Sequence, residues 1–82
     1  MDLVRLKSLR ELARTGTMAA AAESLHLTPS AISQQIAQLE REMDIALTER
    51  QGRGVRLTPA GEALAAHTER IMVVLDEARS DV

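Results

Sequence analysis

Residues 28–39, TPSAISQQIAQL, carry the strongest structural signal in this 82-residue chain. Thr28 is a good helix N-cap, and Pro29 suits the first helical position, where a backbone N–H has no partner within the helix. We therefore predict a helix that begins after Thr28. Its apolar residues recur at spacings of four, three and four, which is typical of one stripe along a helix that faces a core. They are Ile32, Ile36, Leu39 and Met43.

The opposite face of this helix carries hydroxyl and amide side chains, and no formal charge occurs from Leu27 to Leu39. A solvent-facing helix usually carries Lys, Glu and Arg there. Hydroxyls and amides both donate and accept hydrogen bonds, as base edges in the major groove of DNA require. A surface helix that is merely rich in Gln explains the same face, so the neighbouring segments must decide between the two interpretations.

Two helices are expected before this one. Residues 2–14 predict a helix that turns its leucines and Ala13 inward, and Gly16 is suited to ending it. Thr17 can cap a second helix over residues 18–25, whose consecutive alanines favour a close helix crossing. Two short helices joined by a tight turn, the second with a polar outer face, form a helix-turn-helix.

The segment after the third helix is basic. Residues 48–58, TERQGRGVRLT, alternate in character around two glycines, which predicts a short two-stranded hairpin, or wing. From residue 50 onward it carries Arg50, Arg53 and Arg56 and no acid, although the whole chain has a net charge of −2. Such a wing beside a helix-turn-helix suits the sugar-phosphate backbone or the minor groove. A solvated hairpin with scattered arginines is the plainer alternative.

The last helix is longer than so small a core needs. Thr58 and Pro59 repeat the helix-start signal, and the helix can extend to about Arg79. Its apolar residues alternate spacings of four and three, which predicts a seam for a second helix. This seam favours dimerisation, although it can also pack on the first helix of its own chain. The residues expected in the dimer contact are Leu64, His67, Ile71, Val74, Leu75 and Ala78.

The predicted fold is mainly α, with a three-helix core, a short two-stranded β wing and a long C-terminal helix. Residues 1–58 are expected to form the winged helix-turn-helix domain, and residues 59–82 the linker or dimerisation helix. Apolar residues make up 45% of the chain and none is aromatic, so the core must be aliphatic, and a partner chain would add to its stability. No cysteine is present, and no apolar run is long enough to span a bilayer.

Catalytic and metal-binding chemistry is not indicated. His26 and His67 are the only histidines, and no cysteine or acidic cluster accompanies them. We therefore expect no enzyme, no cofactor and no metal site. A helical protein-interaction module would explain the negative net charge and the long last helix, but not an uncharged amide face beside a basic wing. A winged-helix regulator of another family stays open as the nearer alternative.

Short motifs follow one another in a fixed order through nearly the whole chain. They are GTM (16–18), AAAESL (20–25), LTPSAISQQIAQLE (27–40), LTER (47–50) and VRLTPAG (55–61). With this ordered set the chain resembles the N-terminal winged helix-turn-helix domain of LysR-type transcriptional regulators. Any single motif is weak, but their order and spacing are specific.

The resemblance implies sequence-specific binding of double-stranded DNA by a homodimer that regulates transcription in the bacterial cytoplasm, at the nucleoid. Residues 28–42 would lie in the major groove and the wing on the backbone or in the minor groove, while the last helix would pair two subunits on a dyad-symmetric operator. The residue at a helix N-terminus, Thr17, would bind phosphate. The residues expected to contact DNA are Thr17, Thr28, Pro29, Ser30, Ala31, Ser33, Gln34, Gln38, Arg50, Arg53 and Arg56.

The chain departs from the family pattern at several positions. Asp44 stands where Gly is usual, so the turn must differ or Asp44 must adopt a left-handed conformation. Pro29 stands where many members carry a base-reading Gln, and Gln34 where Arg is frequent. These two changes predict a different operator sequence or weaker binding to a single site. Thr48 replaces a Phe and predicts looser packing under the wing.

Members of this family usually continue into a larger effector-binding domain, which is absent from the sequence. We expect an isolated DNA-binding fragment, with a naturally short protein as the alternative. A small-molecule effector and a higher oligomer would then belong only to a full-length protein. The operator sequence, the regulated genes and the direction of regulation do not follow from these residues.

Overall fold

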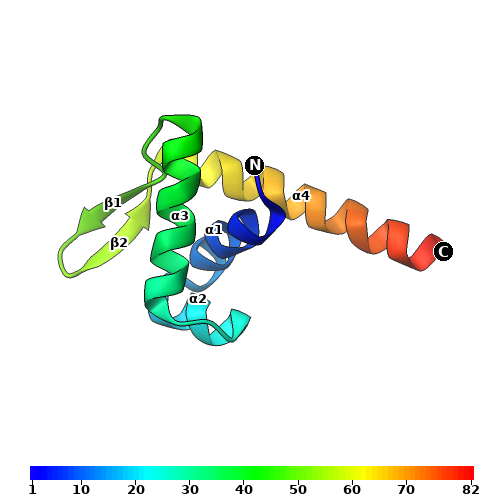
Figure 1. The fold of residues 1–82 in the computed structure, drawn as a ribbon, viewed down its shortest axis with the longest axis horizontal. Helices are drawn as coiled ribbons and strands as arrows, with labels where there is room; N and C mark the ends of the chain where they lie inside the picture. Colours follow the sequence, from blue (N-terminus) through cyan, green and yellow to red (C-terminus); the bar gives the residue numbers. More distant parts are fainter.

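The computed structural model describes all 82 residues and shows a winged helix-turn-helix (Figure 1). A three-helix core carries a two-stranded hairpin on one side and a long C-terminal helix on the other. The elements are α1 (Leu3–Thr15), α2 (Met18–Leu25), α3 (Pro29–Met43), β1 (Thr48–Gln51), β2 (Gly54–Leu57) and α4 (Pro59–Asp81). The mainly α fold expected from the sequence is therefore confirmed.

Threonine caps set the starts of three helices. Thr17, Thr28 and Thr58 each have an extended backbone, and each side chain accepts a hydrogen bond of 3.0 or 3.1 Å from the N–H three residues later. Pro29 and Pro59 follow two of these caps as the first helical residues. Each cap satisfies a backbone donor that the helix itself leaves without a partner. The predicted starts of α2, α3 and α4 are confirmed.

Residues in the left-handed conformation end the first three helices. Gly16 (φ 91°) follows α1, His26 (φ 57°) follows α2 and Asp44 (φ 53°) follows α3. Glycine adopts this conformation without steric cost, whereas a residue with a Cβ is strained there. Asp44 therefore keeps the turn that glycine usually makes, which was one of the two expected outcomes. The left-handed His26 was not predicted.

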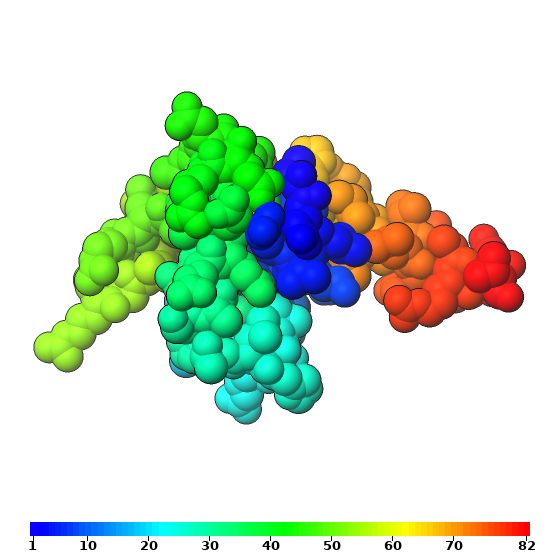
Figure 2. Space-filling view, viewed as in Figure 1, coloured from blue at the N-terminus to red at the C-terminus, as the bar shows by residue number.

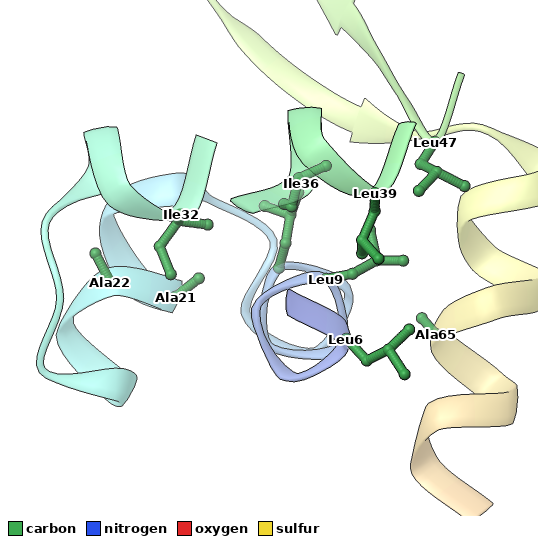
Figure 3. Packing of buried hydrophobic residues seen from close by; sticks show 10 residues of the cluster. Leu6, Leu9, Ala21, Ala22, Ile32, Ile36, Leu39, Leu47 and Ala65 are labelled. Carbon is green, nitrogen blue, oxygen red and sulfur yellow. The ribbon is translucent and has the colours of Figure 1, made fainter. Parts of the chain in front are cut away.

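Aliphatic side chains from α1, α2, α3 and α4 and from the base of the wing meet in one core (Figure 3). Its buried hydrophobic residues are Leu6, Leu9, Leu12, Ala21, Ala22, Ile32, Ile36, Leu39, Leu47 and Ala65. Two residues expected inward are exposed. Met43 is the last residue of α3, directly before the turn at Asp44, and it is 39% exposed. Ala13 lines an open groove between α1 and α4.

The wing is tied to α3 at its base. β1 and β2 pair antiparallel with Thr48 opposite Leu57, and Gly52 makes the tip with a φ of 60°. The Glu40 carboxylate, near the end of α3, accepts hydrogen bonds from the backbone N–H of Leu47 (2.8 Å) and Thr48 (3.2 Å). The position of the hairpin beside α3 is therefore fixed by a side chain as well as by the chain connection.

The last helix begins against the core and ends free of it. Gly61, Ala65 and Thr68 are its buried residues, and a Cβ on Gly61 would lie 2.0 Å from the carbonyl oxygen of Leu47. Only glycine therefore permits this close approach. Beyond Thr68 the side chains are mostly exposed, and Figures 1 and 2 show α4 projecting from the body. No helix of the structure, α4 included, is long and apolar enough to cross a membrane.

Candidate nucleic-acid interface

The polar face predicted on α3 lies on the outside of the molecule, next to the wing (Figures 1 and 2). The residues on this face from the first turns of the helix are exposed: Thr28, Pro29, Ser30, Ser33 and Gln34. Ala31 is half-buried, and its N–H is held by the Thr28 cap. The start of α3 thus presents an uncharged surface of hydroxyls and one amide, which neutral polar edges such as those of DNA bases can match.

Two other amides of α3 already have partners. Arg41 donates to Gln38 Oε1 from Nε (3.1 Å) and Nη2 (2.6 Å). Ser8 of α1 donates its hydroxyl to Gln35 Oε1, so Gln35 serves the contact between α1 and α3. Gln38 keeps its NH₂ group for another acceptor and holds the Arg41 guanidinium on the same face. Among the α3 residues predicted to contact DNA, Gln38 is the one whose side-chain carbonyl already accepts hydrogen bonds within the chain.

The wing and the start of α2 together line a shallow hollow of about 290 Å³. Thr17 comes from the N-terminus of α2, and Arg50 and Arg53 come from the hairpin. The N-terminus of a helix carries a partial positive charge, which two guanidinium groups augment here, and no acidic residue lines the hollow. Three residues predicted to contact DNA, one from α2 and two from the wing, are therefore brought together in a site that suits an anion.

The third wing arginine is in a different situation. Arg56 Nε donates to Glu49 Oε1 across the hairpin at 2.6 Å, which balances its charge. Arg50 and Arg53 are exposed and take part in none of the ion pairs of the structure. The free positive charge of the wing is thus concentrated at Arg50 and Arg53.

The arginines of α1 are balanced within the body. Arg5 pairs with Glu42 of α3 at 2.5 Å, Arg14 pairs with Glu11 at 2.5 Å, and Arg10 pairs with Glu69 of α4. The basic character of the N-terminal segment therefore serves contacts between helices. Lys7 is the one basic side chain of α1 that makes none of these ion pairs, whereas Arg50 and Arg53 leave two unpaired charges on the wing.

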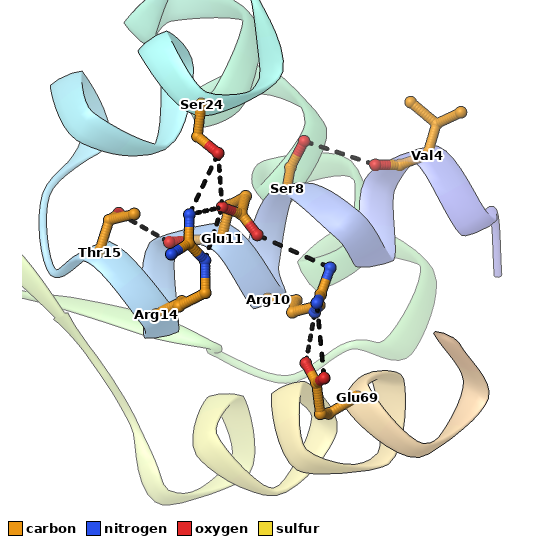
Figure 4. Close-up of polar contacts among 8 residues, drawn as sticks. All are labelled: Val4, Ser8, Arg10, Glu11, Arg14, Thr15, Ser24 and Glu69. Atoms are coloured by element: carbon orange, nitrogen blue, oxygen red, sulfur yellow. Dashed lines mark hydrogen bonds and ion pairs between the residues drawn. The ribbon is translucent and has the colours of Figure 1, made fainter. Parts of the chain in front are cut away.

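Glu11 is a buried charged residue that the sequence pattern did not reveal (Figure 4). Its side chain accepts hydrogen bonds from Arg14 (2.5 and 2.9 Å) and from the Ser24 hydroxyl of α2 (2.7 Å), and Arg10 lies 3.7 Å away. The Arg14 hydrogen bonds, and after them the Ser24 bond, hold the pKa of the Glu11 carboxyl below its ordinary value although burial opposes the shift. Glu11 therefore links α1 to α2 as a carboxylate. The nearby Arg10 and Arg14 were the available sequence signal.

The residues predicted for the dimer contact fall into two groups. Leu64 is half-buried and packs against the core of its own chain. The others are exposed, and four of them lie with Arg70 around an open depression on α4, where Arg70 Nη2 contacts His67 Nδ1. These four residues are His67, Ile71, Val74 and Leu75, and Ala78 follows one turn later.

The geometry defines the class of the protein as a winged helix-turn-helix domain with a projecting helix. The sequence model described as "Bacterial regulatory helix-turn-helix protein, lysR family" matches residues 3–62. The chain belongs to the LysR family. The alternative of another winged-helix family is thereby excluded.

Relatives and solved structures agree with this assignment. An HTH-type transcriptional regulator from the ibpB-leuC intergenic region of Azotobacter vinelandii is 46% identical over 79 residues, which are 96% of this chain and 55% of that protein. The regulator HdfR of Escherichia coli is 43% identical over 82 residues, which are 100% of this chain and 29% of that protein. The chain thus spans about a quarter to a half of the length of such relatives.

Among solved structures, the DNA-binding domain of CbnR in a DNA complex superposes with a TM-score of 0.89 at 34% identity. The match covers 99% of this chain and 93% of that one. The DNA-binding domain of BenM in complex with its benA site 1 DNA gives a TM-score of 0.89 at 29% identity, over 98% and 90% of the two chains. The whole winged helix-turn-helix, including α4, therefore has close structural counterparts.

Proposed function

We propose that this chain binds double-stranded DNA sequence-specifically as a homodimer and thereby regulates transcription in the bacterial cytoplasm. One observation carries the proposal: an uncharged hydroxyl and amide face on α3 lies beside a wing with two unpaired arginines. The similarity to the CbnR domain, which was solved with DNA, supports it. The chain binds its partner and catalyses no reaction.

The residues divide by the part of DNA that they meet. The start of α3 enters the major groove, where Ser30, Ser33 and Gln34 offer hydrogen bonds to base edges, and Thr28, Pro29 and Ala31 line the close approach. Thr17, Arg50 and Arg53 hold phosphates and set the register of the helix in the groove. Gln38 and Arg56 contribute less because each already has a partner within the chain.

Two copies are needed because one copy offers few strong base contacts. Pro29 has no side-chain donor or acceptor, and Gln34 is an uncharged amide. Residues 59–82 pair two chains so that residues 1–58 of each reach one half-site of a dyad-symmetric operator.

Selection from a pool of random duplexes tests the proposal. We expect enrichment of a sequence with an interrupted dyad, bound with salt-dependent affinity in fluorescence anisotropy. If no sequence is enriched, specific recognition is excluded, and a protein-interaction role becomes the better account of the exposed α4 face.

A substitution on α3 tests base reading. Gln34→Ala should alter the preference at one base position of each half-site, at a cost of about 1–3 kcal/mol for each good contact. The change should be confined to that position, because the phosphate contacts do not depend on base identity. An equal loss of affinity for every sequence would contradict the role of Gln34.

A matched pair of substitutions on α4 tests the dimer. Ile71→Asp places a charge in the depression formed with His67 and Val74, and it should yield monomers in sedimentation velocity. Val73→Asp places the same charge on another face of the helix, beside Asp76, and should leave the dimer intact. If Ile71→Asp sediments as a dimer, as Val73→Asp is expected to do, this depression does not mediate self-association.

A further inference from the structure

We propose that the ion pair between Arg10 and Glu69 fixes the angle between α4 and the DNA-reading body, and so sets the half-site spacing that the dimer accepts. The inference rests on the proposed function and adds a positioning role that the family assignment does not give. It concerns two side chains outside the surface that meets DNA.

Mostly small side chains of α4 pack against α1. The fully buried residues of α4 are Gly61, Ala65 and Thr68, all of them small, and Leu64 is the large side chain of this helix that packs beside them, half-buried. Small residues let helices approach closely, but large interdigitating side chains are what fix a crossing angle by ridges and grooves. With Leu64 as the one large side chain packed there, apolar contacts restrain the tilt of α4 only weakly beyond Thr68, and a directional interaction is needed to select one angle.

Arg10 supplies such an interaction (Figure 4). Its Nε donates to one carboxylate oxygen of Glu69, and its Nη2 lies 3.4 Å from the other. On its other side Nη1 lies 3.7 Å from Oε2 of the buried Glu11. Glu11 is itself held by Arg14 and by Ser24 of α2. The guanidinium is thus anchored to the rigid body before it reaches α4, unlike an isolated surface pair.

Because of the position of Glu69, a small change of angle at the ion pair becomes a large displacement at the end of α4. It directly follows Thr68, the last buried residue of α4, so the helix leaves the body at this point. The twelve residues that follow Glu69, up to the end of the helix at Asp81, extend about 18 Å at 1.5 Å per residue. A tilt of about 10° at Glu69 then moves the distal end by about 3 Å, which is close to the 3.4 Å rise of one base pair.

A distance measurement tests the angle without DNA. The chain has no cysteine, so Glu23→Cys on α2 and Ser80→Cys on α4, both at exposed positions, accept spin labels at two chosen sites. With labelled chain diluted in excess unlabelled chain, pulsed electron paramagnetic resonance reports the distance within one subunit. We expect Glu69→Gln to broaden the distance distribution. An unchanged distribution would overturn the inference.

Glu62→Gln is the matched control. Glu62 lines the same groove between α1 and α4 and makes none of the ion pairs of the structure, so the same substitution there should leave the distribution unchanged. Equal broadening of the distance distribution in both variants would show that the loss of a negative charge, and not the loss of the Arg10–Glu69 ion pair, moves the helix. Thermal unfolding of Glu69→Gln checks that the fold is retained, as expected for a side chain that is 54% exposed.

A spacer series tests the consequence for DNA. Duplexes carry the two selected half-sites with the spacer shortened or lengthened by one base pair. The unaltered chain should discriminate the best spacer from these, and Glu69→Gln should reduce that discrimination about threefold to fivefold, the range that an ion pair of this exposure supports. Glu62→Gln should keep it.

The outcomes separate the two proposals. If neither the unaltered chain nor a variant binds any duplex selectively, the proposed function fails. The spin-label distances then remain the only test of the Arg10–Glu69 ion pair. If the unaltered chain binds selectively but shows no spacer optimum, the role of the Arg10–Glu69 ion pair is refuted and the proposed function stands. The same holds if Glu69→Gln discriminates between spacers as strongly as the unaltered chain does, or loses affinity equally at every spacer.

Discussion

Neutralising Arg53 should weaken the salt dependence of DNA binding by a calculable amount. Arg53 is exposed, lines the hollow with Thr17 and Arg50, and has no acidic partner. Each phosphate that a basic side chain neutralises contributes about 0.9 to the slope of log affinity against log salt concentration. A dimer carries two copies, so Arg53→Gln should make the slope shallower by about 1.8.

The expected difference in slope also predicts how the affinities change with salt. Salt raised from about 50 to about 200 mM is a fourfold change, so a slope difference of about 1.8 corresponds to about twelvefold in affinity. The deficit of Arg53→Gln relative to the unaltered chain should therefore shrink about twelvefold over this range. Fluorescence anisotropy of a labelled, selected duplex over a salt series measures both the slope and the deficit.

The ion pair across the wing provides the control. Replacing both partners, Glu49→Gln with Arg56→Gln, keeps the net charge and removes an arginine that is already balanced, so the slope should not change. Glu49→Gln alone frees Arg56 and should steepen the slope by up to about 1.8 in the dimer. If Arg53→Gln leaves the slope unaltered while the double variant lowers it, the assignment of free and balanced arginines is refuted.

Three further predictions concern the fold that presents this surface. Gly61→Ala should lower the free energy of unfolding, measured in urea, by about 1–3 kcal/mol, because the added Cβ would collide with the Leu47 carbonyl oxygen. Retained stability would contradict the close approach of the two backbones. Glu40→Ala should cost about 1–3 kcal/mol and speed amide exchange in β1, since two backbone donors lose their acceptor; unchanged exchange would refute this anchor. The depressed pKa of Glu11 contributes stability that is present above its unfolded pKa, about 4.3, and lost as pH falls through the lower folded value. Glu11→Gln should therefore flatten the acid limb of the urea-stability profile, and parallel profiles would exclude the linkage.

The helix starts were predictable because capping is local chemistry. A threonine followed by Pro, or by a run of alanines after a glycine, leaves few other conformations, and Thr17, Thr28 and Thr58 all cap as expected. The stripe of α3 was predictable for the same reason, because spacing along one helix needs no knowledge of its neighbours. The prediction of the stripe was wrong only at its end: Met43 has the right spacing but lies in the last turn of α3, where it is 39% exposed.

Pairing between segments was not predictable from spacing alone. Arg10 and Glu69, or Glu40 and the start of β1, meet only because the helices cross where they do. The ion pair between Glu49 and Arg56 is the exception, because the turn between the two strands offers a sequence signal for it. A two-residue tip at Gly52 and Arg53 places Glu49 opposite Arg56, whereas a three-residue tip from Gly52 to Gly54 would place Arg50 opposite Arg56.

The negative net charge does not oppose DNA binding once the charges are placed. Several acids, Glu11, Glu42 and Glu69 among them, are matched by arginines of α1 within the body. Others, such as Asp76 and Glu77, lie on the projecting part of α4, at the opposite end of a 45 Å axis from the wing (Figure 1). Screening in physiological salt acts over about 8 Å, so a phosphate at the wing is attracted by its arginines and scarcely repelled by that distant end. The same separation favours approach of DNA with the wing and α3 leading, because the acidic end of α4 is repelled from the duplex.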